Sequence, residues 1–250
     1  RNFIKSTLYS SAGIPLLSAA NASEINAKEE ARYAALDAVL KHPVLKKELF
    51  PDPIIIESCD LLEYNGNYMV RVRSKEGAEG YCVGHNHRMP HLYPMQVMRV
   101  NPFFTGKDAR DLDQLVGEGI MMYENNYKYQ GYALWIPLAT AEMAILDMLG
   151  RIAKKSMGEL IGNIHNTEIA IYRANNNRGR SAEESIERIK KQQAETGAKA
   201  VKFKIGGRRS LPEEPPGRTE RLIPMVREAF DDSITLYADC KGSFDTGEKT

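Results

Sequence analysis

The second half of the chain alternates strand-like and helix-like hydrophobic patterns. Three short runs rich in apolar and β-branched residues are typical of strands: 168–174, 198–207 and 233–240. Between them, two longer runs place apolar residues at helical spacing: 181–197 and 218–230. Ser181 and Glu184 have the spacing of a capping box at the first helix start. This strand and helix alternation builds parallel sheets, so we predict an α/β domain over 163–250.

The first half has the opposite arrangement, with strands first and helices afterwards. Three strand-like runs are separated by turn residues and predict an antiparallel meander: 54–64, 67–77 and 80–84. From Ala109 to Ile161 the pattern is helical, and 139–162 is the clearest stretch. Residues 54–162 are therefore expected to form a small α+β domain. Residues 23–53 precede it as a polar helix and loop, interrupted by Pro43.

The composition of the chain indicates which classes of partner are not expected, but it does not indicate a reaction. The chain has 250 residues, 42% of them hydrophobic and 27% charged, with a formal net charge of +1. So balanced a charge gives no reason to expect nucleic acid or an anionic membrane surface as a partner. Because no uninterrupted apolar run approaches the roughly 20 residues of a membrane-spanning helix, we expect a soluble protein.

The three cysteines, Cys59, Cys82 and Cys240, form neither a CxxC motif nor an even set. One disulfide with a spare thiol and three free thiols are both compatible with this count. Free, buried cysteines are the commoner outcome in a chain with an adequate core, and we assign these residues no function.

Residues 1–22 have the order of regions found in an export signal. A basic cluster at the start is followed by a weakly apolar stretch and by Ala20-Asn21-Ala22, a small-x-small cleavage pattern. The segment resembles a twin-arginine signal, which implies folding before export, a periplasmic location and Ser23 as the first mature residue. The alternative is an ordinary amphipathic helix at the N-terminus.

The strand at 198–207 carries two lysines on one face. Side chains alternate along a strand, so Lys202 and Lys204 point to one side while Val201 and Phe203 point to the other. Two alternating lysines most often mark a solvated face. The Gly206-Gly207 pair places them instead at the carboxyl end of a predicted parallel strand, where α/β enzymes have their sites.

The next strand ends in a carboxylate. Asp239 follows an apolar run, and Lys241 is expected on the same face two residues later. A carboxylate at the end of a strand suits Mg²⁺, which prefers hard oxygen ligands. Asp239 would equally serve to cap the turn or to neutralise the two lysines, and its position alone does not decide between these roles.

Four stretches together resemble the enolase superfamily, specifically its mandelate racemase and muconate lactonizing enzyme group. They are EMAILDMLGRIAKKSMGELIG, AVKFKIGG, REAF and LYADCKGSFD, and the resemblance covers residues 54–250. It implies an α+β capping domain followed by a modified, TIM-like (β/α) barrel, of which about the first three strands are present. It also implies that Lys204 abstracts the proton α to a carboxylate to give an enediolate. Lys202 would be its neighbour at the substrate carboxylate, and Asp239 the first Mg²⁺ ligand.

The chemistry behind these implied roles is coherent. A lysine with its ordinary pKa of about 10.4 is protonated at neutral pH, and a neighbouring cation with partial burial lowers that pKa. Lys202 supplies such a cation. The proton α to a carboxylate is only weakly acidic, so the negative charge that develops needs stabilisation by a metal ion. Sites of the enolase type meet both needs by combining a Lys or His base with Mg²⁺.

Two departures from the family pattern affect the interpretation. Lys241 stands where the family generally has Asn. It would grip an anionic substrate, assist the base, or repel Mg²⁺ and mark a non-catalytic carboxylate-binding relative. The remaining metal ligands and the second acid/base of the family would lie beyond Thr250. We therefore expect a fragment that lacks a complete active site by itself.

The capping domain is expected to select the substrate through its loops at 84–91 and 63–67. His85 and His87 are candidate substrate-binding residues there, beside Lys202 and Lys241 in the second domain. A metal site at His85, His87 and His91 is less well supported, because this spacing on a loop has no defined geometry. We expect structural ion pairs from Asp147 and Arg173, and core or surface packing rather than a sugar platform from five aromatic residues: Tyr123, Tyr127, Tyr129, Tyr132 and Trp135.

The expected function is Mg²⁺-dependent chemistry on a small carboxylate, most simply the dehydration of a sugar acid by a homo-oligomeric lyase. Racemisation, epimerisation or cycloisomerisation on the same scaffold are the alternatives.

Overall fold

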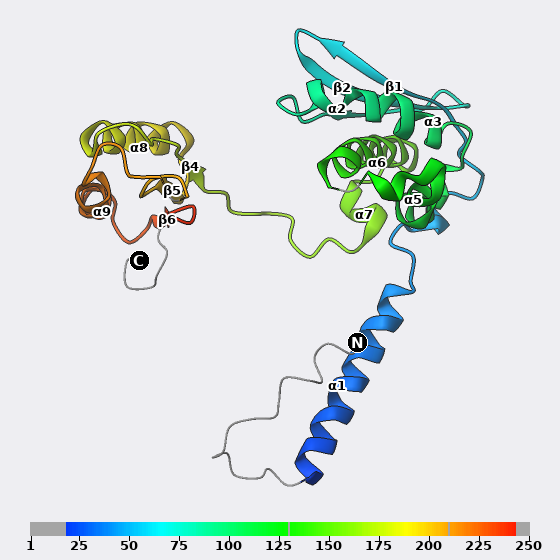
Figure 1. Cartoon of the computed structure of the whole chain (residues 1–250), viewed down its shortest axis with the longest axis horizontal. Helices are drawn as coiled ribbons and strands as arrows, with labels where there is room; N and C mark the ends of the chain where they lie inside the picture. Colours follow the sequence, from blue (N-terminus) through cyan, green and yellow to red (C-terminus); the bar gives the residue numbers. More distant parts are fainter. Residues whose placement is uncertain (1–18, 130, 210, 244–250) are drawn as a thin grey trace. The chain divides into compact units, whose positions relative to one another are not determined.

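The computed structural model describes residues 19–129, 131–209 and 211–243. The chain divides into two compact units, the first ending at Ile164 and the second beginning at His165, two residues from the boundary expected at 162/163 (Figure 1). Most of the signal-like segment, residues 1–18, lies outside the described residues, so its role stays a prediction.

A long helix and a loop lead into the first unit. Helix α1 spans Ala19–Leu40, and its residues from Ala27 onward are exposed. The loop around Pro43 follows, with a single 3₁₀ turn, η1, at Lys47–Leu49. The lead-in thus has the predicted order of helix and then loop.

The first unit contains the predicted antiparallel meander, in the order β1-β2-β3. Its strands are β1 (Ile56–Tyr64), β2 (Asn67–Ser74) and β3 (Glu79–Val83). The tight turn between β1 and β2 uses Asn65 and Gly66, both in the left-handed region with φ of 50° and 74°. Val70, Val72 and Ser74 are fully buried on one face of β2, while Arg71 and Arg73 between them are more exposed. This alternation confirms a sheet with one buried face.

The helical part of the first unit begins earlier than the pattern from Ala109 suggests. A series of short helices and turns starts directly after the β3 loop: α2 (Met89–Met95), η2 (Gln96–Val100), α3 (Asn101–Phe104), η3 (Ala109–Asp111), α4 (Leu112–Gln114), η4 (Leu115–Gly119), α5 (Ile120–Met122) and η5 (Tyr123–Lys128). The clearest helical stretch of the sequence, 139–162, falls on two helices, α6 (Tyr132–Ala153) and α7 (Met157–Ile161). Lys154 adopts a left-handed conformation that ends α6.

Helix α6 is the centre of the first unit's core and packs against the meander (Figure 1). By length and composition α6 is the one helix in the described chain that would suffice to cross a membrane, but 61% of its most apolar window is buried inside the protein. Its hydrophobicity is therefore explained by its position in the core.

The second unit is a three-stranded parallel sheet in the order β4-β5-β6. Its elements are β4 (Arg173–Ala174), α8 (Ala182–Thr196), β5 (Ala200–Lys204), α9 (Arg218–Ala229) and β6 (Thr235–Asp239). The capping box of Ser181 and Glu184 is confirmed. The strand expected at 168–174 is shortened to two residues, with Ile169 and Ile171 exposed.

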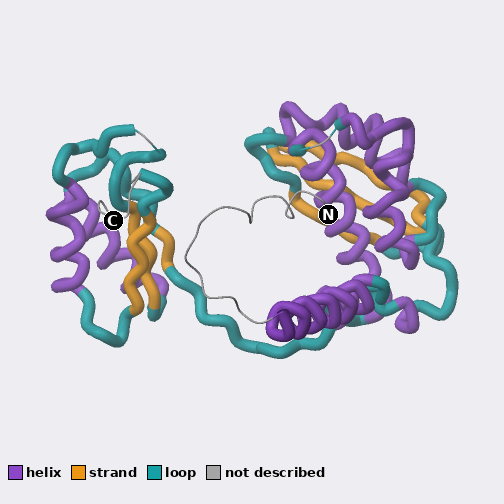
Figure 2. Tube along the Cα trace, turned by 60° about the horizontal axis from the view of Figure 1, so that its bottom comes forward, coloured by secondary structure: helices purple, strands orange, loops and turns teal. Residues whose placement is uncertain are grey.

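Helices α8 and α9 cover one face of this sheet (Figure 2). Val201 and Phe203 of β5 are buried against them, together with Leu222 and Val226 of α9. The opposite face carries the lysines of β5. Three parallel strands with helices on one side match the beginning of a (β/α) barrel; closure of the barrel stays a prediction.

Candidate functional site

The register of β5 and β6 brings the predicted site residues together. Lys204 is paired with Asp239, and Lys202 with Tyr237, so both lysines and the carboxylate lie on the same face at the carboxyl ends of the strands. The structure places Lys202, Lys204 and Asp239 together as expected, and their roles in catalysis and binding stay predictions. These are the strand ends at which α/β folds place ligands.

Asp239 is the centre of the charge cluster. Its Oδ2 atom accepts a hydrogen bond from the Nζ atom of Lys204, and the Nζ atom of Lys202 lies 3.6 Å away. Lys202 also donates to the hydroxyl of Tyr172 at 3.1 Å. The Lys204 side chain is 11% exposed and that of Asp239 21%, so the pair is only partly screened by water.

These contacts fix the charge state of two groups. The hydrogen bond from Lys204 is the main cause that lowers the pKa of Asp239 below its ordinary value, so the carboxylate stays ionised near neutral pH. The hydrogen bond to Tyr172 is the largest influence on Lys202 and raises its pKa, with Asp239 adding to the effect. Lys202 therefore carries its positive charge near neutral pH, which suits its predicted place beside a substrate carboxylate.

Arg178 organises the rim of the site through backbone carbonyls. Its Nε atom donates to Gly207 at 2.6 Å and Gly206 at 3.3 Å, and an Nη atom donates to Ile205 at 3.1 Å and Asp239 at 3.4 Å. These carbonyls follow β5 or end β6. Nothing in the spacing of the sequence distinguished Arg178 from other loop arginines.

Beneath the lysines, Arg218 supports the end of β5 from α9. Its guanidinium donates to the Lys204 carbonyl at 2.9 Å and to the Ser185 hydroxyl at 3.1 Å. Arg218 is 2% exposed, and this burial lowers the pKa of its guanidinium, although Glu213 at 4.0 Å opposes the effect. Because Arg218 holds the backbone of Lys204, it positions the strand end rather than contacting the site face.

Lys241 occupies a turn instead of the strand face expected for it. The strand ends at Asp239, and Lys241 and Gly242 are both left-handed, with φ of 52° and 69°. The turn closes with a hydrogen bond from the Ser243 amide to the Cys240 carbonyl at 2.9 Å. The Lys241 amide donates to Oδ1 of Asp239 at 3.1 Å, so the turn also orients the carboxylate.

A cavity of about 450 Å³ opens beside these groups. It is lined by Asn176, Arg178, Lys204, Arg208 and Lys241. Arg208 was not among the site residues predicted from the sequence. Its position directly after Gly206-Gly207, at the end of the strand that carries the two lysines, is the one sequence feature that could have indicated it. Among the described residues, the lining is strongly cationic and includes no carboxylate.

Asp239 fits Mg²⁺ as one ligand of a larger set. It is an ionised oxygen donor at a strand end, and Mg²⁺ commonly uses one or two carboxylates together with water and substrate. Within residues 19–129, 131–209 and 211–243, no group of three or more metal-binding side chains occurs. Further oxygen ligands would be needed to outweigh the neighbouring cations.

The histidines predicted to bind substrate belong to the first unit. His85 and His87 are exposed in the loop after β3, with ring centroids 6.2 Å apart, and His91 lies on α2. His85 lines an open apolar groove of about 440 Å³ together with Tyr132 and Trp135. No metal cluster occurs among the described residues here, and the substrate-binding role of both histidines stays a prediction.

The two predicted structural ion pairs have different outcomes. Asp147 accepts from Arg151 at 2.9 Å and from the Tyr81 amide at 2.9 Å, which ties α6 to β3 and confirms its structural role. Arg173 forms no ion pair with any described residue, and its buried Nε atom lacks a partner there. The ion pair predicted for Arg173 therefore does not form within the described part of the chain.

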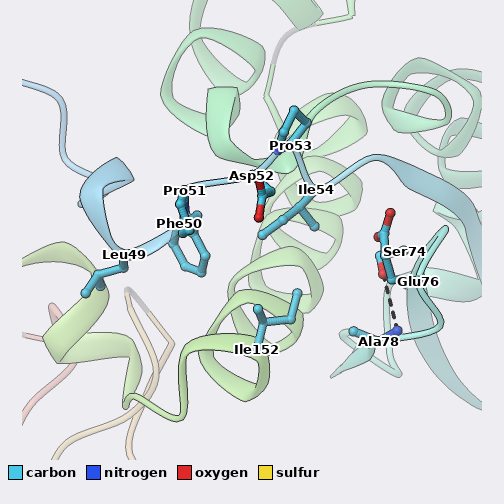
Figure 3. A pocket seen from close by; sticks show the side chains of 10 residues that line it. All are labelled: Leu49, Phe50, Pro51, Asp52, Pro53, Ile54, Ser74, Glu76, Ala78 and Ile152. Carbon is cyan, nitrogen blue, oxygen red and sulfur yellow. Dashed lines mark hydrogen bonds between the residues drawn. The ribbon is translucent and has the colours of Figure 1, made fainter.

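A second pocket in the first unit has no lysine in its described lining, unlike the cavity beside Lys204. It measures about 220 Å³ and lies between the segment that leads into β1, the β2–β3 turn and α6 (Figure 3). Phe50, Ile54 and Ile152 give it an apolar wall, and Ser74 accepts from the Ala78 amide at 3.2 Å. We assign it no catalytic function.

All three cysteines are free thiols, as expected. Cys59 is buried, its thiol donates to Oδ1 of Asn101 at 3.2 Å, and burial raises its pKa to about 12. Native protein should therefore react with iodoacetamide at the half-buried Cys82 and Cys240, and at Cys59 only after denaturation. Peptide mass spectrometry before and after urea treatment measures this. Labelling of Cys59 in the native state as fast as Cys240 would contradict its burial.

Comparison with solved structures finds the same architecture in several enzymes. A protein assigned as a racemase from Roseobacter denitrificans is 25% identical, with a TM-score of 0.66 over 75% of this chain and 50% of that one. A mandelate racemase/muconate lactonizing protein from Paracoccus denitrificans, complexed with magnesium, is 20% identical, with a TM-score of 0.59 over 76% and 51%. The predicted resemblance is confirmed. This chain has the fold of the enolase superfamily.

Other enolase-superfamily structures extend the comparison. An enolase from Agrobacterium radiobacter, bound to sodium and L-malate, is 16% identical, with a TM-score of 0.60 over 74% of this chain and 48% of that one. Further similar structures are described as a dehydratase, an isomerase and a cycloisomerase. The present chain spans about half the length of these structures. No protein-family model and no curated protein sequence matches it.

Proposed function

We propose that the complete protein abstracts the proton α to a carboxylate, with Lys204 as the general base and an enediolate as the product of that step. The observation that carries this proposal is the convergence of Lys204, Lys202 and Asp239 on one face at the carboxyl ends of adjacent strands. An amine, a second cation and a carboxylate in contact provide the base, the substrate anchor and a metal ligand in one place.

Lys202 binds the substrate in this proposal. It remains charged, is 25% exposed at its side chain, and is held by the Tyr172 hydroxyl, so its ammonium is presented in a defined position. A substrate carboxylate that pairs with Lys202 brings its α-carbon toward Lys204, the next residue on the same face. A charge-assisted contact of this kind orients the substrate as well as binding it.

Lys204 must be a neutral amine in order to accept the proton. In the present structure its Nζ atom is hydrogen-bonded to Asp239, so this contact has to give way before Lys204 acts. Asp239 also accepts from the Lys241 amide, which keeps the carboxylate oriented after Lys204 has left it. Mg²⁺ bound at Asp239 would supply a Lewis acid for the negative charge that develops on the substrate carboxylate.

Among enolase-superfamily reactions, we favour dehydration of a sugar acid. A dehydratase, racemase, isomerase and cycloisomerase all occur among the similar structures, so loss of water from the product is the measurement that separates these outcomes. The rival from a different class is a non-catalytic carboxylate-binding protein, which the extra cation Lys241 favours. It would bind acids without Mg²⁺ and without exchange. A homo-oligomeric state and export through a twin-arginine signal stay predictions.

Removal of the metal should abolish α-proton exchange. The full-length protein is incubated with sugar acids in D₂O and Mg²⁺, and incorporation of deuterium at the α-carbon is followed by NMR. With EDTA, exchange should fall by at least about 10²-fold and return when Mg²⁺ is added in excess, because the developing charge loses its Lewis acid. Binding of acids without any exchange at saturating Mg²⁺ would favour the non-catalytic alternative instead.

A further inference from the structure

The cavity beside Lys204 holds more positive charge than the proposed reaction uses. Proton abstraction needs one base and one cation for the substrate carboxylate, and Lys204 and Lys202 fill these roles. Of these two lysines, Lys204 lines the cavity, together with three further cations, Arg178, Arg208 and Lys241. Its neighbour Asp239 is already paired with both lysines of β5. Among the described residues, no carboxylate lines the cavity to balance this charge.

The three extra cations are not equivalent. The donors of Arg178 are directed at four backbone carbonyls, so its guanidinium serves the strand ends. The side chains of Arg208 and Lys241 form no ion pair or hydrogen bond with any residue in 19–129, 131–209 or 211–243. Both are exposed on the cavity wall. They are therefore free, within the described chain, to bind a ligand.

The backbone conformation of Lys241 makes asparagine a suitable replacement at this position. Its φ of 52° is in the left-handed region, where Asn and Gly are favoured and a side chain such as lysine is strained. An asparagine would build the same turn without this strain. Arg209 and Lys154 share the left-handed conformation, with φ of 59° and 54°, so the backbone does not by itself mark a binding residue; it serves to choose Lys241→Asn as a test variant.

We propose that Arg208 and Lys241 form a second anion subsite, and that the substrate is a small dicarboxylic acid. One carboxylate pairs with Lys202 next to the carbon that Lys204 deprotonates, and the distal carboxylate is held between Arg208 and Lys241. The inference rests on the proposed function for the first half of this arrangement. A cavity of about 450 Å³ is within the range of pockets for small ligands, and Arg is well suited to bind a planar carboxylate.

The test compares two probes that differ in the distal carboxylate. L-Malate and L-lactate share the 2-hydroxy acid group, and malate adds a second carboxylate. Their affinities for the full-length protein with saturating Mg²⁺ are measured by calorimetry. We expect malate to bind at least about tenfold more tightly than lactate. Arg208→Gln and Lys241→Asn should each weaken malate binding by about fivefold and leave lactate binding unchanged.

Arg209→Gln is the matched control. Arg209 is the exposed neighbour of Arg208, and it does not line the cavity, so the substitution removes the same charge from the same loop. Malate binding should stay within twofold of wild type. Lys241→Asn relieves the backbone strain, so its melting temperature should be equal to or above that of wild type, which excludes unfolding as the reason for weaker binding.

Equal affinity for malate and lactate in the wild-type protein would overturn the subsite. So would an equal loss for both ligands in Arg208→Gln and Lys241→Asn, or a loss in Arg209→Gln as large as in Arg208→Gln. These outcomes are distinguishable from a failure of the proposed reaction. Preference for malate without α-proton exchange would support the subsite and refute proton abstraction by Lys204. Exchange without preference for malate would overturn the subsite and support the proton abstraction.

Discussion

Replacing Lys204 with alanine should lower α-proton exchange by about 10²- to 10⁴-fold in the full-length protein, the contribution expected of a positioned general base. Asp239 loses its ion pair with Lys204 in this variant but keeps the hydrogen bond from the Lys241 amide. Its carboxylate is then freer to bind a cation, so Mg²⁺ affinity should be maintained or increased. Exchange is measured by NMR in D₂O and Mg²⁺ binding by calorimetry.

Two further variants serve as controls. One tests whether the positive charge of Lys204, rather than its basicity, supports exchange, and the other tests the effect of removing a different lysine. Lys204→Arg keeps a cation beside Asp239 but supplies no base, because an arginine is always protonated, so it should be as inactive as Lys204→Ala. Lys199→Ala removes an exposed lysine just before β5 and should retain exchange within twofold. Exchange above about a tenth of wild type in Lys204→Ala would refute the assignment of Lys204 as the base.

Gly80→Ala should destabilise the first unit by about 3 kcal/mol or more. A Cβ atom at this position of β3 would lie 2.2 Å from the Ala144 carbonyl oxygen and 2.2 Å from the Met148 amide nitrogen, both on the backbone of α6. Backbone atoms cannot rotate out of the way, so α6 would have to move off the meander and lose part of its buried contact. Urea unfolding followed by circular dichroism measures the change in the free energy of unfolding.

Gly158→Ala is the control for this effect. Gly158 lies in α7 of the same unit, and a Cβ atom there meets side-chain carbons of Ile164 at 3.6 Å and 3.7 Å, which is ordinary contact. Because alanine is also the better helix former, Gly158→Ala should change stability by less than about 1 kcal/mol, in the stabilising direction. Similar stability of the two variants would mean that α6 does not pack on β3 as described.

The order of the β1-β2-β3 meander and of the elements from α8 to β6 was predictable from the sequence because these elements have a clear period. The alternation along 198–207 predicted that Val201 and Phe203 lie on the face opposite the two lysines. In the structure, Val201 and Phe203 are buried against α8 and α9. The parallel arrangement then required the next strand to end nearby, which placed Asp239 beside Lys204. For these residues, local pattern and tertiary structure agree.

Other features depend on contacts that no local pattern contains. Arg208 became a candidate only through the cavity that it lines, because a loop arginine has no periodicity. Lys241 was expected on the strand face, since alternation does not reveal that β6 ends at Asp239 and turns through left-handed residues. The burial of Arg218 was equally invisible, because its partners lie on α8 and at the end of β5.

The hydrogen bonds of Arg178 reduce the conformational entropy that the protein would lose when a ligand binds. One guanidinium connects the carbonyls of Ile205, Gly206, Gly207 and Asp239, so the loop after β5 and the end of β6 are already restricted in the free protein. Ordering such a rim at the moment of binding would consume part of the interaction energy. Because folding has already ordered it, the few contacts of a small acid contribute to affinity and orientation instead.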